Sequence, residues 1–243
     1  MEPVFADTLR IVTNMPQEPS IRYRGLLATP LVKQPQNTVF RVINLDCLDA
    51  CVDLRREFPE ACIGLLNMAS DKSPGGGVVN GAHAQEEDIC RRSTLYPTLI
   101  RQRYPLLHDE LLFTPNVKII KNKMYETCQQ HVNINGIVSS PAIRRPILNN
   151  AGRYSDADLK LMKNKIDMML ETFEYHDIDH LVLGAWGCGA FRNPPEQVAQ
   201  LFKEALIKRN VSFKVVVFAI MTRNVHEDVN VKAFKEAFGV NYV

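Results

Sequence analysis

The sequence lacks a CxxC pair, a long apolar run and an excess of charge of either sign. Its six cysteines stand at positions 47, 51, 62, 90, 128 and 188, several of them inside apolar segments. This distribution of cysteines is typical of proteins with reduced thiols in the cytoplasm or nucleus. The longest apolar run, Val215 to Met221, has seven residues. That is far short of the ~18 residues that a membrane-spanning helix needs.

The charge balance and the start of the chain exclude further classes. The 29 Lys and Arg residues and 27 Asp and Glu residues give a net charge of +2, unlike a dedicated polyanion-binding protein. Apolar residues make up 46% of the 243 positions, which favours one packed domain or a tight pair over disorder. Met1-Glu2-Pro3-Val4 has neither the basic nor the apolar region of a signal peptide. We therefore expect a soluble intracellular protein, cytoplasmic or nuclear and not secreted.

The spacing of apolar residues predicts an α/β fold. Apolar runs without polar alternation, separated by helical segments, indicate a sheet buried on both faces and mostly parallel at its centre. We expect residues 1–37 to form an N-terminal helix (5–14) and an irregular wrapping arm, and residues 38–243 to form the α/β domain itself. The predicted strands are 38–43, 62–67, 117–120, 136–139, 180–185 and 214–220. The predicted helices are 46–58, capped by Asp46, 85–103 with a candidate break at Pro97, 155–173, capped by Ser155, 195–208 and 229–238.

A first glycine-rich loop, residues 73–87, follows the strand that ends near Asn67 and opens a helix. Ligands of open α/β sheets bind beyond the carboxyl ends of strands. Gly75-Gly76-Gly77 carry no Cβ, so their backbone N–H groups can approach an anion closely, and the helix start adds partial positive charge. The alternative is a flexible surface loop. Gln85-Glu86-Glu87 directly downstream favours the functional interpretation.

A second glycine-rich loop, Gly184 to Phe191, also joins a buried strand to a helix. It lacks the third glycine of a dinucleotide-binding fingerprint, so that match is weak. The alternative interpretation is that this loop is only a tight turn with a buried aromatic residue. Two such loops at one sheet edge fit a diphosphate held between them.

Glu86 and Glu87 are candidate acid–base groups. Neighbouring residues on a helix point about 100° apart, so the two cannot face one atom in the same way. One can orient the substrate while the other transfers a proton. The helix start lowers a carboxyl pKa, whereas burial, the adjacent carboxylate and a bound diphosphate raise it. The alternative is a pair of ordinary acidic residues in a first helical turn.

Other groups give weaker signals. His176 and His180 have the spacing of metal ligands, but a polar loop before a strand is the better interpretation. Cys188 is a possible thiol nucleophile, or only a small residue in a glycine turn. His83 either contacts a ligand or is solvated. The basic residues Lys118, Lys121, Lys123, Arg144 and Arg145 are expected on solvated faces, where they could attract an anionic polymer.

The first loop carries a specific resemblance. Three glycines followed after seven residues by Gln85-Glu86-Glu87 resemble the GGG-x(6–8)-QEE signature of poly(ADP-ribose) glycohydrolases. Residues 5–9, 66–70, 93–96 and 183–191 resemble the microbial-type branch of that family. The likeness spans roughly residues 5–240.

The resemblance implies a macrodomain-like three-layer α/β/α sandwich with a mixed central sheet and an N-terminal helical arm, which binds ADP-ribose. It implies that Glu87 is the catalytic residue and that Glu86 binds the ribose hydroxyls beside the scissile bond. The two loops would hold the diphosphate and the terminal ribose, with Asn80 near that ribose and Phe191 packed against it. The implied substrate-binding residues are Gly75, Gly76, Gly77, Asn80, Gln85, Gly187, Cys188, Gly189, Ala190 and Phe191.

The resemblance implies no metal and no redox cofactor. The expected partners are poly(ADP-ribose), ADP-ribose and ADP-ribosylated proteins, with no membrane and no sequence-specific nucleic acid. Glycoside cleavage passes through an oxocarbenium-like transition state. One carboxyl group can protonate the leaving ribose oxygen and then activate water.

Two segments depart from the family pattern, residues 139–146 and Arg192, so the resemblance does not determine the fine shape of the adenosine side or the chain-end preference. Two alternatives also stay open. The protein could hydrolyse mono-ADP-ribose from protein or nucleic acid, or it could bind ADP-ribose without cleaving it. The presence of Glu87 argues against the second.

Overall fold

The computed structural model describes residues 1–26, 37–208, 212–224 and 228–241. One seven-stranded sheet in the order β1-β4-β5-β3-β6-β7-β2 forms its centre. Strands β5, β3, β6, β7 and β2 are parallel, whereas β1, β4 and β5 pair antiparallel. The strands are β1 (Ile21–Arg24), β2 (Val39–Ile43), β3 (Ile63–Asn67), β4 (Glu110–Lys121), β5 (Thr127–Ser139), β6 (His180–Leu183) and β7 (Val215–Ala219).

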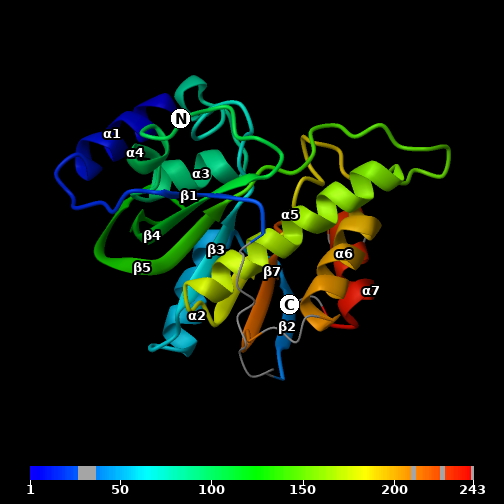
Figure 1. Cartoon of the computed structure of the whole chain (residues 1–243). Coiled ribbons are helices and arrows are strands. Elements are labelled where there is room, and N and C mark those ends of the chain that lie inside the picture. The colour runs from blue at the N-terminus through cyan, green and yellow to red at the C-terminus, as the bar shows by residue number, and fades with distance from the viewer. Residues whose placement is uncertain (27–36, 209–211, 225–227, 242–243) are drawn as a thin grey trace.

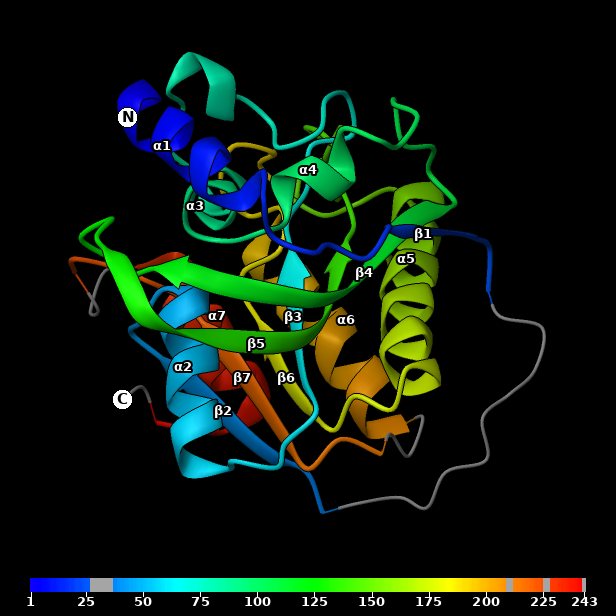
Figure 2. The same ribbon diagram turned by 90° about the vertical axis from the view of Figure 1, so that its left-hand side faces the viewer.

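Helices cover both faces of the sheet (Figures 1 and 2). One buried cluster joins the sheet to α5, α6 and α7 and includes Met169, Phe202 and Phe234. The other includes Leu48 and Ile89 and lies against α1, α2 and α3. The predicted three layers are therefore present. The helices are α1 (Glu2–Val12), α2 (Cys47–Glu57), α3 (Gln85–Arg92), α4 (Tyr96–Leu99), α5 (Asp156–Tyr175), α6 (Pro195–Lys208) and α7 (Val229–Phe238), with a 3-10 turn η1 (Val78–Asn80).

Local sequence explains the central elements. Every residue of β3, β6 and β7 is buried, as expected for strands covered on both faces. Both predicted helix caps are confirmed. Asp46 accepts hydrogen bonds from the N–H groups of Leu48 and Asp49 at the start of α2, and Ser155 accepts one from Asp158 at the start of α5.

The strands at the antiparallel side of the sheet differ from the prediction. Residues 117–120 and 136–139 were expected to be short strands, but they are parts of β4 and β5, which are 12 and 13 residues long. The first half of β5 is polar and mostly exposed, so it carries no apolar run. Residues 15–37 were expected to be irregular, yet β1 pairs with β4 in the register Ile21↔Phe113. The rest of the predicted arm, residues 27–36, lies outside the described residues.

The helix predicted over residues 85–103 is two helices. It ends at Arg92 because Ser93 adopts an extended conformation and forms a bridge with Ile119 of β4. Pro97 is in the first turn of α4, where a proline is tolerated, and is not the break.

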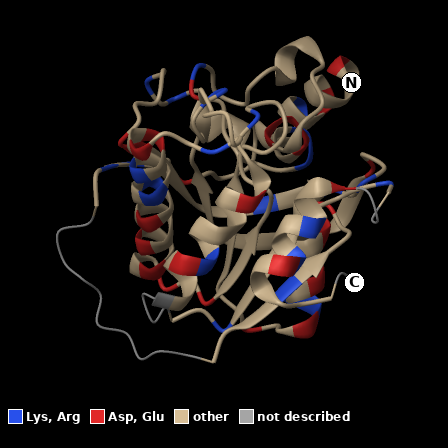
Figure 3. Cartoon of the chain, turned by 90° about the vertical axis from the view of Figure 1, so that its right-hand side faces the viewer, with Lys and Arg blue, Asp and Glu red and all other residues tan. Residues whose placement is uncertain are grey.

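Charged residues of both signs are interspersed on the helices of the face shown in Figure 3. This distribution agrees with the small net charge of the sequence. None of the helices in the described ranges is long and apolar enough to cross a membrane.

Candidate active site

A cleft of about 680 Å³ lies at the carboxyl ends of the parallel strands. Its wall combines the first glycine-rich loop and the start of α3 with residues after β5, β6 and β7. This is the edge at which the sequence placed ligand binding.

Glu86 is buried in the wall of the cleft, with 3% of its surface exposed. Its Oε2 accepts a hydrogen bond of 2.6 Å from the Ser70 N–H, and its Oε1 accepts one of 3.4 Å from the Asn67 side-chain amide. Burial raises the pKa of Glu86 to about 8, against the lowering effect of these hydrogen bonds. The group is therefore largely protonated at neutral pH.

Glu87 is also buried, with 7% of its surface exposed. Its Oε1 accepts a 2.8 Å hydrogen bond from the Gly77 N–H. Its Oε2 has no hydrogen-bond partner among the described residues. Glu87 therefore has one carboxyl oxygen that is hydrogen-bonded and one that has no partner among the described residues.

Both carboxyl groups converge on Gly76. A Cβ at Gly76 would lie 2.4 Å from Oε1 of Glu87 and 3.0 Å from Oε2 of Glu86. Glu86 and Glu87 are neighbours on a helix and were expected to point apart. Their long side chains nevertheless bring both carboxyl groups to the same glycine. Gly76 also has φ +58°, which favours glycine.

The other glycines of the first loop pack against protein. A Cβ at Gly75 would lie 2.7 Å from the Tyr96 ring, and one at Gly77 would lie 2.7 Å from the Ala82 Cβ. The N–H of Gly76 bonds to the Ser73 carbonyl, and that of Gly77 to Glu87. The loop is therefore not a loosely packed surface segment. The polar group that this loop contacts in the structure is the protein's own Glu87 carboxyl group.

Gln85 ties the start of α3 to the end of β3. Its Oε1 accepts a 2.8 Å bond from the Met68 N–H, and its Nε2 donates a 2.6 Å bond to the Leu66 carbonyl. These bonds fix the helix start from which both glutamates project.

The second glycine-rich loop is built differently. Its Trp186 is fully buried, and its Nε1 donates to the Ser140 carbonyl at 2.9 Å. Gly187 has φ +75°, and a Cβ there would lie 2.5 Å from the Ala142 Cβ. Gly189 has open space around its missing Cβ. Within the described part of the chain, the consecutive N–H groups of Gly189, Ala190 and Phe191 have no acceptor. Such a run of free N–H groups suits an anion.

Most of the predicted site residues line this cleft. They are Gly76, Gly77, Gln85, Glu86, Glu87, Gly187, Gly189, Ala190 and Phe191. Gly75, Asn80 and Cys188 lie outside its wall. Gly75 faces Tyr96, Asn80 is exposed at the end of η1, and the Cys188 thiol donates to the Trp186 carbonyl.

The weaker signals have structural partners. Burial raises the pKa of Cys188 to about 12, which opposes a thiolate nucleophile. His176 stacks on Phe113, and its Nε2 lies 2.9 Å from the Tyr23 hydroxyl. His180 bonds to Asp179. Across the described ranges, no group of three or more His, Cys, Asp or Glu side chains could hold a metal ion.

Of the basic residues expected on solvated faces, Lys121 is not solvated, whereas Arg144 is exposed and also contacts the site. Lys121 is buried and forms a 2.6 Å ion pair with Asp7 of α1. Arg144 lines the cleft. His83 also lies on the cleft wall and is exposed.

The sequence argument did not assign a site role to Asn67 or Arg144. Asn67 is buried at the end of β3, where its side-chain amide donates to Glu86 and, at 2.9 Å, to the Ser139 hydroxyl. An asparagine that ends an apolar strand before a glycine-rich loop is a local signal that could have identified it. Arg144 carried no such signal, because its contacts come from distant parts of the chain.

Comparisons with known proteins show which family the chain resembles. The family model for the microbial-type PARG catalytic domain matches residues 13–122. Poly(ADP-ribose) glycohydrolase from Thermomonospora curvata is 26% identical over 98% of both chains, with a TM-score of 0.80. The same enzyme bound to the inhibitor ADP-HPD is 26% identical over 97% of this chain and 98% of that chain, with a TM-score of 0.79. No curated protein matches the chain.

A solved structure from a second organism shows the family. Poly(ADP-ribose) glycohydrolase from Deinococcus radiodurans in complex with ADP-ribose is 30% identical over 83% of this chain and 84% of that chain, with a TM-score of 0.70. The seven-stranded mixed sheet and its helices match the macrodomain-like fold of these neighbours. The chain belongs to the family of microbial-type poly(ADP-ribose) glycohydrolases.

Proposed function

We propose that this protein cleaves the ribose–ribose O-glycosidic bonds of poly(ADP-ribose) and releases ADP-ribose. The observation that carries the proposal is the convergence of two buried carboxyl groups on Gly76, in a cleft walled by two glycine-rich loops. Family membership supports it, as do neighbours solved with ADP-ribose and with ADP-HPD.

Glu87 is the proton donor of this proposal. Its Oε1 is held by the Gly77 N–H, which fixes the carboxyl plane, and its Oε2 is uncommitted among the described residues. A proton passes from Glu87 to the leaving ribose oxygen as the C–O bond breaks. Water then attacks the oxocarbenium-like ribose, and the Glu87 carboxylate accepts the proton of that water.

Glu86 holds the ribose hydroxyls beside the bond that breaks. Because burial raises its pKa to about 8, it enters the cycle uncharged at neutral pH. An uncharged Glu86 adds no negative charge near the substrate diphosphate. The free N–H groups of Gly189, Ala190 and Phe191, which line the same cleft, receive that diphosphate.

Two measurements on the unmodified protein test this proposal. The first is release of ADP-ribose from poly(ADP-ribose) attached to protein, compared with release from singly ADP-ribosylated protein. The second is calorimetric titration with ADP-ribose. At a ligand concentration a hundredfold over Kd, the free energy of unfolding should rise by about 2.7 kcal/mol.

The outcomes separate the alternatives. Release from polymer supports the proposal. Release from singly modified protein alone would indicate a mono-ADP-ribosyl hydrolase, and binding without release would indicate a reader. An absence of binding at millimolar ADP-ribose would overturn all three.

A further inference from the structure

Arg144 lies on the rim of the cleft and contacts two loops that are far apart in the sequence. Its guanidinium carbon lies 4.1 Å from the centroid of the Phe191 ring, in the second glycine-rich loop. Its Nε donates a 3.0 Å hydrogen bond to Oδ1 of Asp71, and its second terminal nitrogen also bonds to that oxygen. Asp71 belongs to the loop that follows β3 and leads into the first glycine-rich loop.

The backbone around Arg144 is anchored on both sides. The N–H of Arg145 donates a 2.7 Å bond to the Phe191 carbonyl. The side-chain amide of Asn193 donates to the carbonyls of Ile143 and Gly187 at 2.8 and 3.0 Å. The Asp71 carbonyl accepts a 2.8 Å bond from the Leu106 N–H. The Arg144 side chain therefore joins two loops that are each fixed elsewhere.

We infer that Arg144 is a positioning residue that holds Phe191 and ties the two walls of the substrate cleft together. The inference deepens the proposed function and rests on it. Arg144 and Phe191 both line the cleft, whereas Asp71 does not. A planar guanidinium stacks on an aromatic face and binds a carboxylate through two nitrogens at the same time, whereas a lysine ammonium has neither the plane nor the second nitrogen.

The role follows from shape and not from net charge. Asp71 already neutralises Arg144, whose side chain is only 38% exposed. A phenylalanine at the end of a glycine-rich turn has rotamer freedom that must be lost when a ligand packs on it. The stacked guanidinium removes that freedom before the ligand arrives. The cleft wall at Phe191 is therefore ordered before the substrate binds. Arg144 should for this reason increase the affinity for the substrate and leave the rate of proton transfer unchanged.

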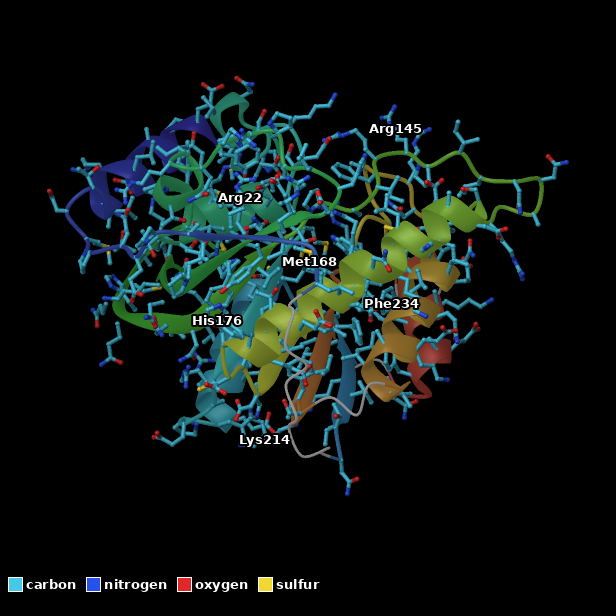
Figure 4. The ribbon with its side chains drawn as sticks, in the orientation of Figure 1. Arg22, Arg145, Met168, His176, Lys214 and Phe234 are labelled. Atoms are coloured by element: carbon cyan, nitrogen blue, oxygen red, sulfur yellow. The ribbon has the colours of Figure 1, made fainter. Side chains whose placement is uncertain are left out.

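The test uses Arg144→Ala with Arg145→Ala as its matched control. Both variants lose one positive charge, and the Arg145 N–H that bonds to Phe191 is kept in both. Arg145 is exposed, its side chain forms no hydrogen bond or ion pair with another described residue, and Figure 4 shows it at the outer edge of its loop. The measurements are the Kd for ADP-ribose, KM and kcat on poly(ADP-ribose), and hydrogen exchange of the free protein.

We expect Arg144→Ala to raise Kd and KM about tenfold, because a partly exposed cation–π contact and an ion pair are both lost. The value of kcat and its pH profile should stay near those of the wild type. Exchange should accelerate in residues 69–77 and 184–193. Arg144→Lys should retain only part of the wild-type affinity. Arg145→Ala should match the wild type in Kd, KM, kcat and hydrogen exchange.

A second variant guards against a general loss of folding. Asp71→Asn keeps the shape of the partner but removes its charge, so it should raise Kd by a smaller factor than Arg144→Ala. Combined with Arg144→Ala, it should add nothing further, because both act on one contact. Equal Kd and exchange in Arg144→Ala and Arg145→Ala would overturn the inference, as would additive effects in the double variant.

The exchange measurement separates the two proposals because it needs no ligand. Accelerated exchange in Arg144→Ala without any ADP-ribose binding by the wild type would support the contact and reject the proposed function. Normal wild-type turnover with no effect of Arg144→Ala on KM would reject the positioning role alone.

Discussion

The two glycine-rich loops occupy equivalent places after β3 and β6, yet they use their glycines in opposite ways. In the first loop, the N–H groups of Gly76 and Gly77 are already bonded within the protein, and Gly76 lacks a side chain because two carboxyl groups occupy that space. In the second loop, three consecutive N–H groups have no acceptor in the described part of the chain, and Gly189 faces open space.

This difference separates chemistry from binding. In the proposed function, the first loop positions Glu87, the proposed proton donor, so its glycines shape the surroundings of that carboxyl group. The second loop presents unused donors on the cleft wall, and its Gly189 leaves open space beside them. Substitutions in the two loops should therefore have different effects on turnover, stability and affinity.

The largest expected effect is that of Glu87→Gln on turnover. Glutamine keeps the size of the side chain and can still accept the Gly77 N–H bond, but it has no proton to deliver. General acid catalysis contributes ~10²–10⁴-fold, so kcat on poly(ADP-ribose) should fall by at least that factor. Binding of ADP-ribose should survive, because the diphosphate donors lie on the other loop. A folded Glu87→Gln protein with near-normal release of ADP-ribose would contradict the assignment.

A smaller but still large effect is expected for Gly76→Ala. Its new Cβ would lie 2.4 Å from Oε1 of Glu87, and its φ of +58° is unfavourable for alanine. We expect turnover to fall and the free energy of unfolding to drop by about 1–3 kcal/mol. The matched control is Gly152→Ala, with φ +70° and no atom within 4 Å of the new Cβ.

The control isolates the clash with the carboxyl groups. Gly152→Ala loses the same backbone freedom without touching the site, so the difference between the two variants measures the displacement of Glu86 and Glu87. Thermal or denaturant unfolding and single-turnover kinetics give the two quantities. Equal turnover in Gly76→Ala and Gly152→Ala would show that the carboxyl groups tolerate the added methyl.

Gly189→Val tests the second loop and should have a moderate effect on affinity alone. Nothing lies within 4 Å of its missing Cβ and its φ is not positive, so stability should change by no more than about 0.5 kcal/mol. A branched side chain beside the three free N–H groups should weaken ADP-ribose binding by about tenfold or more. Gly189→Ala should give an intermediate Kd. Unchanged affinity in a folded Gly189→Val protein would place the diphosphate elsewhere.

Local sequence patterns could predict the parallel half of the fold and the two loops. The caps at Asp46 and Ser155, the apolar runs of β3 and β7, and the glutamates after the glycines all depend on residues that are close in the chain. Each of these features forms from its own segment, so a single sequence suffices to locate it.

The features that sequence could not predict depend on partners far along the chain. Residues 21–24 become a strand only because the edge of β4 is available for pairing. Lys121 is buried because Asp7, 114 positions away, neutralises it. Arg144 meets Asp71 across 73 positions. No local pattern encodes such contacts, and the bonding state of each loop's N–H groups also depends on how the loops pack.

The last expected effect concerns the pH dependence of stability and sharpens the contrast at the first loop. The pKa of Glu86 rises from 4.5 to about 8 through burial, so between these values the folded protein keeps a proton that the unfolded chain releases. The free energy of unfolding should therefore fall as pH rises from about 4.5 to about 8, and this contribution should then level off. Glu86→Gln removes the titrating group, so its stability should decline less than that of the wild type over this window. Denaturant unfolding at several pH values measures the difference, with Gly189→Ala as a control that keeps Glu86. Parallel pH profiles for Glu86→Gln and the wild type would mean that Glu86 ionises normally in the folded protein.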